Sequence, residues 1–266
     1  MKRLIIILIL VNMLLVPIVY SKEGHLTLLA VKETEDGFEG STADMYLEIQ
    51  PGEGRVFLDT FPLTKVDTQI STRFAKEVAC NFLNRDCSEQ DFIFTIKAES
   101  AIIAGPSAGA AAAVLTAILL EDLKPNESIS ITGTINSGGL IGNVGGIKEK
   151  IEAGTDAGLK KILIPKGEKI ATNITQSSEK LGWEIVNDTL TIEITNKTKN
   201  IEKKINVTAY SKENVDIKEV STLNDAIFEF TGKRFEEDGQ ELPVDNEYAK
   251  IMKSPSLDLC NRSDKL

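Results

Sequence analysis

"AGPSAGAAAAVLTAILL", from Ala104 to Leu120, is a glycine-proline turn followed by an almost entirely apolar run. From Ser107 onward the residues are nearly all Ala, Val, Ile and Leu, so a helix here has no solvent-facing side and should be buried in the centre of a domain. The turn itself has the Gly-x-Ser-x-Gly pattern of a serine nucleophile that opens a helix. The stretch therefore predicts a buried helix with a candidate nucleophile, Ser107, at its start.

A histidine does not supply the base for this serine. The chain has one histidine, His25, which precedes Ser107. The α/β-hydrolase order requires an acid and then a histidine after the serine, so that class is excluded. A chymotrypsin-like order would use His25, but His25 lies near the start of the expected mature chain, where chain ends are loosely held. We expect a surface histidine.

A lysine can act as the base when burial or a helix N-terminus favours its neutral form. The stretch "VGGIKEK" places Lys148 in the first turn of a predicted helix, beside Ile147 and Ile151. Lys150 is about 200° around the helix from Lys148, so only one of the two can point inward. We predict that Lys148 is the inward lysine. From helix position alone, the alternative is that both are solvent lysines.

Two further motifs do not support a function. "SSEK", from Ser177 to Lys180, fits the Ser-x-x-Lys pattern of penicillin-recognising enzymes, but their companion patterns are missing, so we expect a surface helix there. "GGLIGNVGG" is rich in glycine but lacks the Gly-Lys-Ser/Thr of a phosphate loop. No pair of cysteines has zinc-ligand spacing. We therefore expect neither a cofactor nor a metal.

The rest of the chain predicts alternating strands and helices. The N-terminal part indicates a small β-meander, and the segment after the apolar helix indicates strands separated by a helix, which implies a parallel crossover. Ile70, Phe74 and Val78 have helical spacing, with Asp67 or Thr68 as a cap. The expected strands are 26–31, 43–49, 55–60, 91–98, 128–135 and 162–165, the expected helices are 67–83, 147–161 and 168–183, and a hairpin over 189–210 precedes a strand and a terminal helix.

The net charge of -10 argues against a nucleic-acid binder, which normally has a basic face. Lys2 and Arg3 precede an uncharged run over 4–20, which indicates a secretory signal peptide or an N-terminal membrane anchor and places the rest of the chain outside the cytoplasm. Asn-x-Ser/Thr sequons agree with export; they begin at Asn126, Asn173, Asn187, Asn196, Asn206 and Asn261.

Three cysteines bear on the redox compartment. Cys80 and Cys87 are close enough to form a disulfide across a short loop, which an oxidising compartment would permit. Cys260 would then be unpaired. The alternative is three unrelated thiols.

Taken together, "GPSAG" with its apolar helix, "ITGTI" and "GNVGGIKEKIEAGTDAGLKKILIP" resemble the proteolytic domain of Lon proteases over roughly 101–165, with a weaker match on both sides. The resemblance implies an α+β fold (ribosomal protein S5 domain 2-like), with an N-terminal β-meander before a β-α-β core whose helices pack on the sheet. It also implies that Ser107 is the nucleophile, that Lys148, 41 residues later, is the general base, and that Thr132 supports the dyad.

By the same resemblance, the backbone at Gly105, Pro106 and Ala108 forms the turn and the oxyanion donors. Two positions depart from the family: Ala104 replaces a usual acidic residue, and Thr134 replaces a common glutamate. The sequence has no Walker-type ATPase motif, so the resemblance implies an ATP-independent serine endopeptidase for peptides or unfolded proteins. The sequence is similar to exported or membrane-anchored Lon-like proteins of archaea and bacteria.

Lon proteolytic domains assemble as rings, which implies a homo-oligomer. The alternative function is a catalytically weak or inactive module of the same fold that acts in protein binding or assembly at the cell surface. We expect a signal peptide or membrane anchor over 1–21, a Lon-like serine protease domain over 22–232 with an insertion at about 169–210, and a charged C-terminal tail over 233–266.

Overall fold

The computed structural model describes residues 21–34, 37–61, 63–98, 105–178, 185–186, 189–190, 198–211 and 215–236. The predicted N-terminal segment apart from Ser21, the departure at Ala104, and the predicted tail beyond residue 236 lie outside the described residues. Among the residues described, no helix has both the length and the apolar character needed to cross a membrane.

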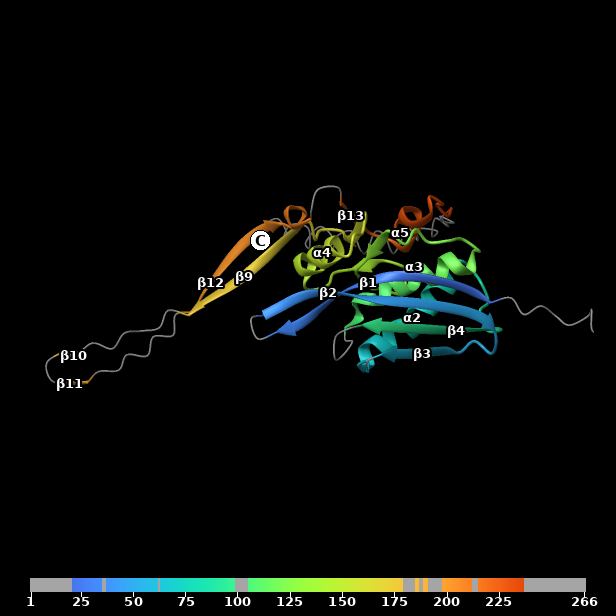
Figure 1. Ribbon diagram of the computed structural model, residues 1–266, viewed down its shortest axis with the longest axis horizontal. Coiled ribbons are helices and arrows are strands. Elements are labelled where there is room, and N and C mark those ends of the chain that lie inside the picture. The colour runs from blue at the N-terminus through green and yellow to red at the C-terminus, as the bar shows by residue number, and fades with distance from the viewer. Residues whose placement is uncertain are drawn as a thin grey trace, which may run out of the picture. The chain divides into compact units, whose positions relative to one another are not determined.

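Groups of strands are separated by single helices along the chain (Figure 1). The strands are β1 Lys22–Thr34, β2 Gly37–Pro51, β3 Val56–Phe61, β4 Gln90–Ala98, β5 Ile129–Ile131, β6 Thr134–Ile135, β7 Ile141–Gly142, β8 Lys161–Pro165, β9 Ile170–Ser178, β10 Ile185–Val186, β11 Thr189–Leu190, β12 Thr198–Asn206 and β13 Asp216–Val220. The α-helices are α2 Val66–Phe82, α3 Gly109–Leu120, α4 Ile147–Asp156 and α5 Leu223–Thr231, and the 3₁₀-helices are η1 Pro106–Ala108 and η2 Val207–Tyr210.

The first sheet has the strand order β1-β2-β4-β3. β1 and β4 each pair antiparallel with β2, whereas β3 pairs parallel with β4 after the crossover through α2. The prediction of a β-meander is therefore wrong for its third strand. The physical reason is that β4 carries three fully buried residues, Phe92, Phe94 and Ile96, and takes a central position, whereas β3 alternates half-buried and exposed side chains as an edge strand does.

The apolar helix lies where the sequence predicts it. All residues of α3 from Gly109 to Leu120 are buried. β1 lies against its C-terminal half, because a Cβ atom on Gly24 would stand 3.0 Å from a methyl group of Leu115 and 2.9 Å from one of Leu119. α3 is thus the central buried helix against which the first sheet and α2 pack (Figure 1).

α2 also forms as predicted, but of the predicted apolar face Val78 alone is buried. Ile70 and Phe74 are exposed, while the buried face consists mainly of small side chains such as Ser71, Thr72 and Ala75. Small residues allow α2 to approach α3 closely. Neither Asp67 nor Thr68 is the N-cap residue, which is Lys65 without a side-chain cap.

The second sheet has the order β13-β8-β5 and is parallel throughout, so the predicted crossover between β5 and β8 is confirmed. α4 packs between this sheet and the β1–β2 hairpin in a cluster that contains Leu29, Ile147 and Ile162. Gly40 of β2 lies so close to α4 that a Cβ atom would stand 1.9 Å from the Glu149 carbonyl oxygen, which restricts this position to glycine.

The region beyond β8 differs from the predicted helix. β9 pairs antiparallel with β12 over nine residues, from Ile170 opposite Asn206 to Ser178 opposite Thr198. The prediction of a helix over 168–183, and with it a surface helix at "SSEK", is therefore wrong up to residue 178. The β-branched residues of "IATNIT" favour a strand over a helix when a partner strand is available. η2 returns the chain to α4, where Val207 joins the buried cluster.

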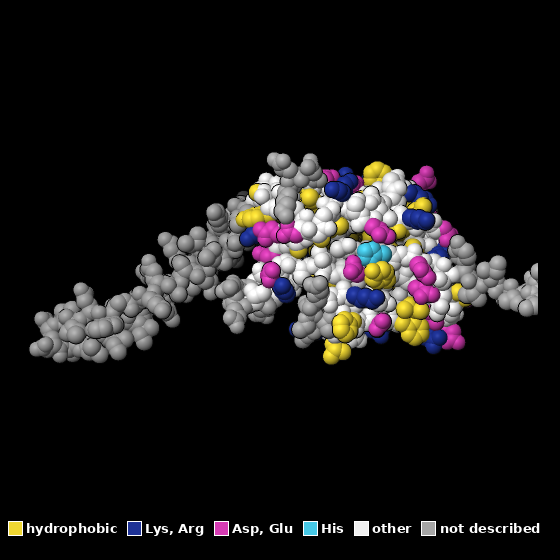
Figure 2. Space-filling view, in the orientation of Figure 1, with side chains coloured by type: hydrophobic (Ala, Val, Ile, Leu, Met, Phe, Trp, Pro, Cys, Tyr) yellow, Lys and Arg dark blue, Asp and Glu magenta, His cyan; other side chains and the backbone are white. Residues whose placement is uncertain are grey.

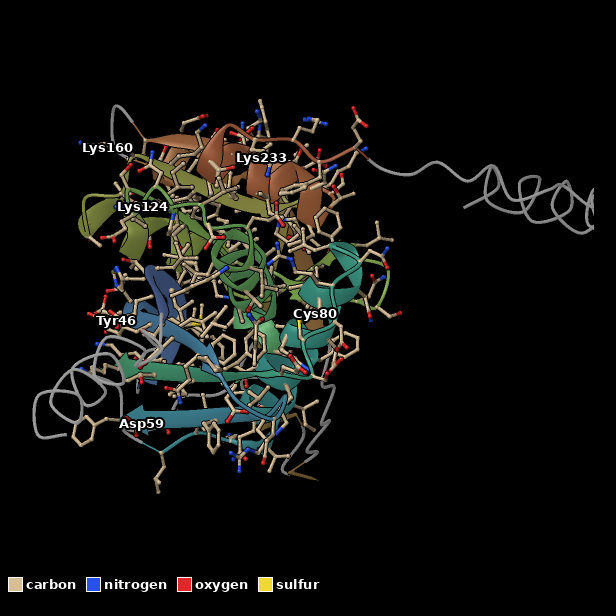
Figure 3. The ribbon with its side chains drawn as sticks, turned by 90° about the vertical axis from the view of Figure 1, so that its right-hand side faces the viewer. Tyr46, Asp59, Cys80, Lys124, Lys160 and Lys233 are labelled. Carbon is tan, nitrogen blue, oxygen red and sulfur yellow. A yellow bond between two sulfur atoms is a disulfide. The ribbon has the colours of Figure 1, made fainter. Side chains whose placement is uncertain are left out.

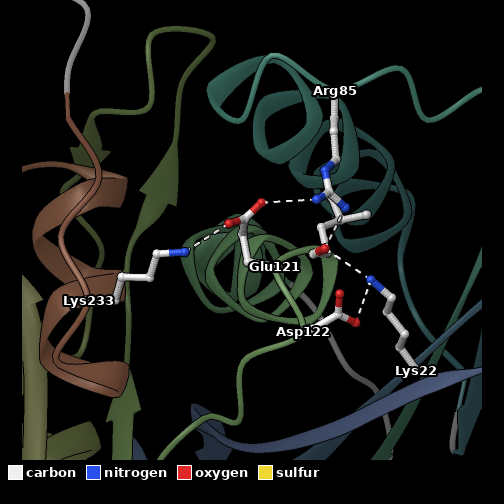
Figure 4. A network of polar contacts seen from close by, with 6 residues as sticks. Lys22, Arg85, Glu121, Asp122 and Lys233 are labelled. Carbon is white, nitrogen blue, oxygen red and sulfur yellow. Dashed lines mark hydrogen bonds and ion pairs between the residues drawn. The ribbon is translucent and has the colours of Figure 1, made fainter.

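The predicted disulfide is confirmed: Cys80 and Cys87 are bonded at the end of α2, as Figure 3 shows. Arg85, within that loop, and Lys22 both donate to the Leu120 carbonyl oxygen at the end of α3. Glu121 continues this network to Arg85 and Lys233 (Figure 4). The C-terminal end of α3 is therefore fixed by cations from several segments, which complement the helix dipole.

On the face in Figure 2, Lys and Arg side chains stand between Asp and Glu side chains, without a basic stripe.

Candidate active site

Ser107 lies in η1, at the N-terminal end of the buried helix, and is half-buried. Gly105 precedes it with φ +101° and ψ 150°, a conformation that only glycine adopts readily. The Ser107 carbonyl oxygen accepts a hydrogen bond from the Gly133 amide at 3.0 Å, and the Ala110 amide donates to the Gly133 carbonyl at 3.0 Å. These two bonds fasten the start of α3 to the segment that follows β5.

Thr132 is the neighbour of Gly133 and lies at the carboxyl end of β5. Its amide donates to the Leu163 carbonyl of β8 at 3.1 Å, and its side chain is buried. The Thr132 hydroxyl accepts a hydrogen bond of 3.1 Å from the Nζ atom of Lys150. Thr132, which binds the lysine, and Gly133, which binds the Ser107 carbonyl, are therefore consecutive residues.

The inward lysine is Lys150, so the prediction that Lys148 points inward is wrong. Lys150 belongs to the buried stripe of α4 and is 3% exposed. Lys148 points away from this stripe: its side chain is 38% exposed, pairs with Glu152 at 3.9 Å, and lies 4.8 Å from the ring centre of Tyr210. Since the two lysines are about 200° apart on the helix, the packing of one inward directs the other outward.

Burial lowers the pKa of Lys150 from its ordinary value of 10.5 to about 8, and the charge of Glu168 opposes this shift. Glu168 lies just after β8, and the pKa of its own carboxyl group is raised, first by burial and then by the nearby charge of Glu219. Thr132 and Glu168 thus follow neighbouring parallel strands, and their carboxyl ends meet at one edge of the sheet. At pH near 8, Lys150 can both accept and release a proton.

The backbone donors differ in part from the prediction. Gly105 already donates its amide hydrogen to Asp67 at 3.0 Å, and Pro106 has no amide hydrogen, so both shape the turn and neither is an oxyanion donor. The amide of Gly109 donates to the Pro106 carbonyl. The N–H groups of Ser107 and Ala108 are the remaining candidates in the first turn, where a helix has no internal acceptors.

His25 lies far from this site along α3. It follows Gly24, which packs at the C-terminal end of α3, whereas Ser107 is at the opposite end. His25 is also not on a loose chain end, because it belongs to β1 and lies 2.9 Å from an Asp44 carboxylate oxygen and 3.5 Å from one of Glu127. The expectation of a simple surface histidine is therefore corrected to a part-buried one.

Sequence reasoning missed two residues of the site. Lys150 follows Ile147 by three positions and precedes Gly154 by four, so the stripe of Ile147, Lys150, Ile151 and Gly154 carries a helical signal for it. Asp67 has no such signal, since its contact with Gly105 joins residues 38 positions apart.

Thr134, the second departure from the family pattern, lies in the short strand β6 and is half-buried.

The family model of the "Lon protease (S16) C-terminal proteolytic domain" matches residues 65–208. A Lon protease of Paraburkholderia phytofirmans is 33% identical over 120 residues, which are 43% of this chain and 15% of that protein. An archaeal Lon protease of Archaeoglobus fulgidus is 33% identical over 85 residues, which are 32% and 14%. A Lon protease of Campylobacter concisus is 44% identical over 62 residues, which are 23% and 8%. The matches thus span only a small part of these relatives' length.

Proposed function

Because the chain belongs to the family of Lon protease C-terminal proteolytic domains, we propose that it is a serine endopeptidase with Ser107 as nucleophile and Lys150 as general base. The observation that carries the proposal is the buried hydrogen bond between Lys150 and Thr132, directly behind the backbone that holds Ser107. The charge of Glu168 favours the ammonium form of this lysine, but burial outweighs it and brings the pKa of Lys150 to about 8.

In the proposed mechanism, neutral Lys150 accepts the proton of the Ser107 hydroxyl as its oxygen attacks a peptide carbonyl. Thr132 holds the amine of Lys150 in place through their 3.1 Å hydrogen bond. The N–H groups of Ser107 and Ala108, at the positive end of α3, stabilise the oxyanion. The Lys150 ammonium then protonates the leaving amine, and Lys150 next activates the water that hydrolyses the acyl-enzyme.

We also propose that the protein acts outside the cytoplasmic membrane, without ATP, on peptides or unfolded proteins. The positive start and uncharged run before residue 21 support export, as does the Cys80–Cys87 disulfide, which is typical of oxidising compartments. ATP independence is the remaining part of the proposal, and an assay without ATP tests it. A homo-oligomeric ring remains part of the proposal through the family alone.

The test is hydrolysis of casein without ATP by the wild-type protein, Ser107→Ala, Lys150→Ala and Lys148→Ala. We expect cleavage by the wild type and Lys148→Ala, no cleavage by Ser107→Ala, and a strongly reduced rate for Lys150→Ala. A wild type no more active than Ser107→Ala would refute the enzyme and favour the non-catalytic module.

A further inference from the structure

A carboxylate from α2 reaches the turn that presents Ser107. The Oδ2 atom of Asp67 accepts a hydrogen bond from the Gly105 amide at 3.0 Å, and its Oδ1 atom accepts one from the Thr68 amide at 2.8 Å. The Thr68 hydroxyl donates to the Gly105 carbonyl at 3.4 Å. The first turn of α2 therefore contacts both polar groups of Gly105, although 38 residues separate Gly105 from Asp67.

Helix capping explains only half of this arrangement. The Oδ1 bond satisfies an N–H group of the first turn of α2, as acidic residues there commonly do. The Oδ2 bond adds nothing to α2, because its donor belongs to the turn before η1. The contact with Gly105 thus has to be explained by what it does at that turn.

At the turn, the contact restricts the backbone that leads to Ser107. Gly105 has φ +101°, and among the residues that the structure describes no atom beyond its chain neighbours lies within 4 Å of the position where a Cβ would stand. The hydrogen bonds to Asp67 and from Thr68 are the polar contacts that hold this conformation. Pro106 follows with a φ fixed by its ring, and Ser107 comes next. Fixing Gly105 therefore fixes the direction of the Ser107 side chain.

We propose that Asp67 is a positioning residue of the Ser107 site: through Gly105 it orients the Ser107 hydroxyl and the N–H groups of Ser107 and Ala108. This inference rests on the proposed peptidase function. In this sequence Ala104 stands where the family usually has an acid, and the carboxylate at the turn comes from a neighbouring helix. Asp67 is exposed, and its removal leaves the backbone amides of Thr68 and Gly105 without their carboxylate acceptor.

The experiment compares steady-state kinetics of a fluorogenic peptide for the wild type, Asp67→Ala, Asp67→Asn and Asp59→Ala. Asp59 is an exposed acid on β3 and serves as the matched control for lost surface charge. We expect Asp67→Ala to lower kcat roughly 10–100-fold with KM and Tm almost unchanged, because a misplaced nucleophile loses rate rather than affinity. Asp67→Asn should recover part of kcat, since its amide oxygen can accept one bond, and Asp59→Ala should match the wild type.

An unchanged kcat in Asp67→Ala would overturn the positioning role while leaving the peptidase intact. A fall in Tm that accounts for the loss of kcat would also overturn it. A wild type no more active than Ser107→Ala would instead refute the proposed function.

Hydrogen exchange of the Gly105 amide, measured by NMR, tests the contact without any activity. We expect this amide to be protected in the wild type and in Ser107→Ala, and to exchange faster in Asp67→Ala. Equal exchange in the wild type and Asp67→Ala would overturn the inference whatever the kinetics show.

Discussion

The Lys150 ammonium nitrogen lies 3.1 Å from the Thr132 hydroxyl oxygen, in a buried pair that joins α4 to the end of β5. The charged lysine ammonium can only donate hydrogen bonds, whereas the neutral amine can both donate and accept, so the Thr132 hydroxyl can bind either protonation state. The pair provides a fixed place for a lysine that changes its charge.

Lys150→Ala is expected to lower kcat/KM roughly 10²–10⁴-fold, the range for loss of a general base. Lys148→Ala, two positions along the same helix, should retain wild-type activity because Lys148 faces solvent and Glu152. Initial rates with casein or a fluorogenic peptide measure both. The reverse pattern, with only Lys148→Ala inactive, would return the base to the position first predicted.

The pH–rate profile should rise with pH and have its midpoint near pH 8, because the neutral amine of Lys150 is the proposed general base and its pKa is about 8. Roughly a tenth of the lysine is neutral at pH 7. Measurement of kcat/KM from pH 6 to pH 10 checks this value. A profile flat across that range would contradict a lysine base.

Glu168→Gln should shift the same midpoint to lower pH. The charge of Glu168 raises the pKa of Lys150, so its removal leaves burial to lower that pKa further. The neutral fraction at pH 7 then increases, and with it the rate at that pH. Glu152→Gln, which removes an acid facing Lys148, is the matched control and should leave the midpoint unchanged.

Lys150→Met should stabilise the protein at neutral pH while it abolishes activity. A pKa lowered from 10.5 to about 8 means that the folded state binds fewer protons than the unfolded state between these pH values, so the free energy of unfolding rises with pH there and the full penalty applies below pH 8. That penalty is about 3 kcal/mol, and the loss of a donor to Thr132 reduces the net gain to about 1–2 kcal/mol.

Urea unfolding of Lys150→Met and wild type at pH 7 and pH 10 measures this difference. The gain should be larger at pH 7 than at pH 10. An equal loss of stability at both pH values would show that burial of the charged Lys150 side chain does not destabilise the folded protein.

Replacing both Cys80 and Cys87 by alanine should destabilise the protein by about 2–3 kcal/mol, since the disulfide closes a short loop. Thermal unfolding with and without reductant measures the effect. Cys260→Ala is the control and should keep the full response to reductant. A wild type whose unfolding does not respond to reductant would contradict the bond.

The sequence predicts the parts of the site that depend on local pattern. The apolar run after Ser107 can only be a buried helix, and "GPSAG" can only be its turn. The two isoleucines alone do not decide between Lys148 and Lys150, because the choice depends on which side of α4 meets β2 and β8. The position of Gly154 in the same stripe is the local signal that favours Lys150. The Gly40 contact with Glu149, which sets the rotation of α4, joins distant segments.

The same limit explains the errors in the fold. The strand order β1-β2-β4-β3 follows from the burial of Phe92 and Phe94 in a central strand. The order of the strands along the chain does not reveal their order in the sheet. β9 forms because β12 pairs with it, so its residues read alone are ambiguous.

α3 has no solvent-facing position from Gly109 to Leu120, and both of its ends are fastened to neighbouring segments. Any larger or charged side chain along it would have to be accommodated inside the protein, so sequence drift there is confined to near-isosteric exchanges. Natural or directed evolution of a cleavage preference would therefore have to alter the segments around the first turn of α3, while α3 itself stays constant.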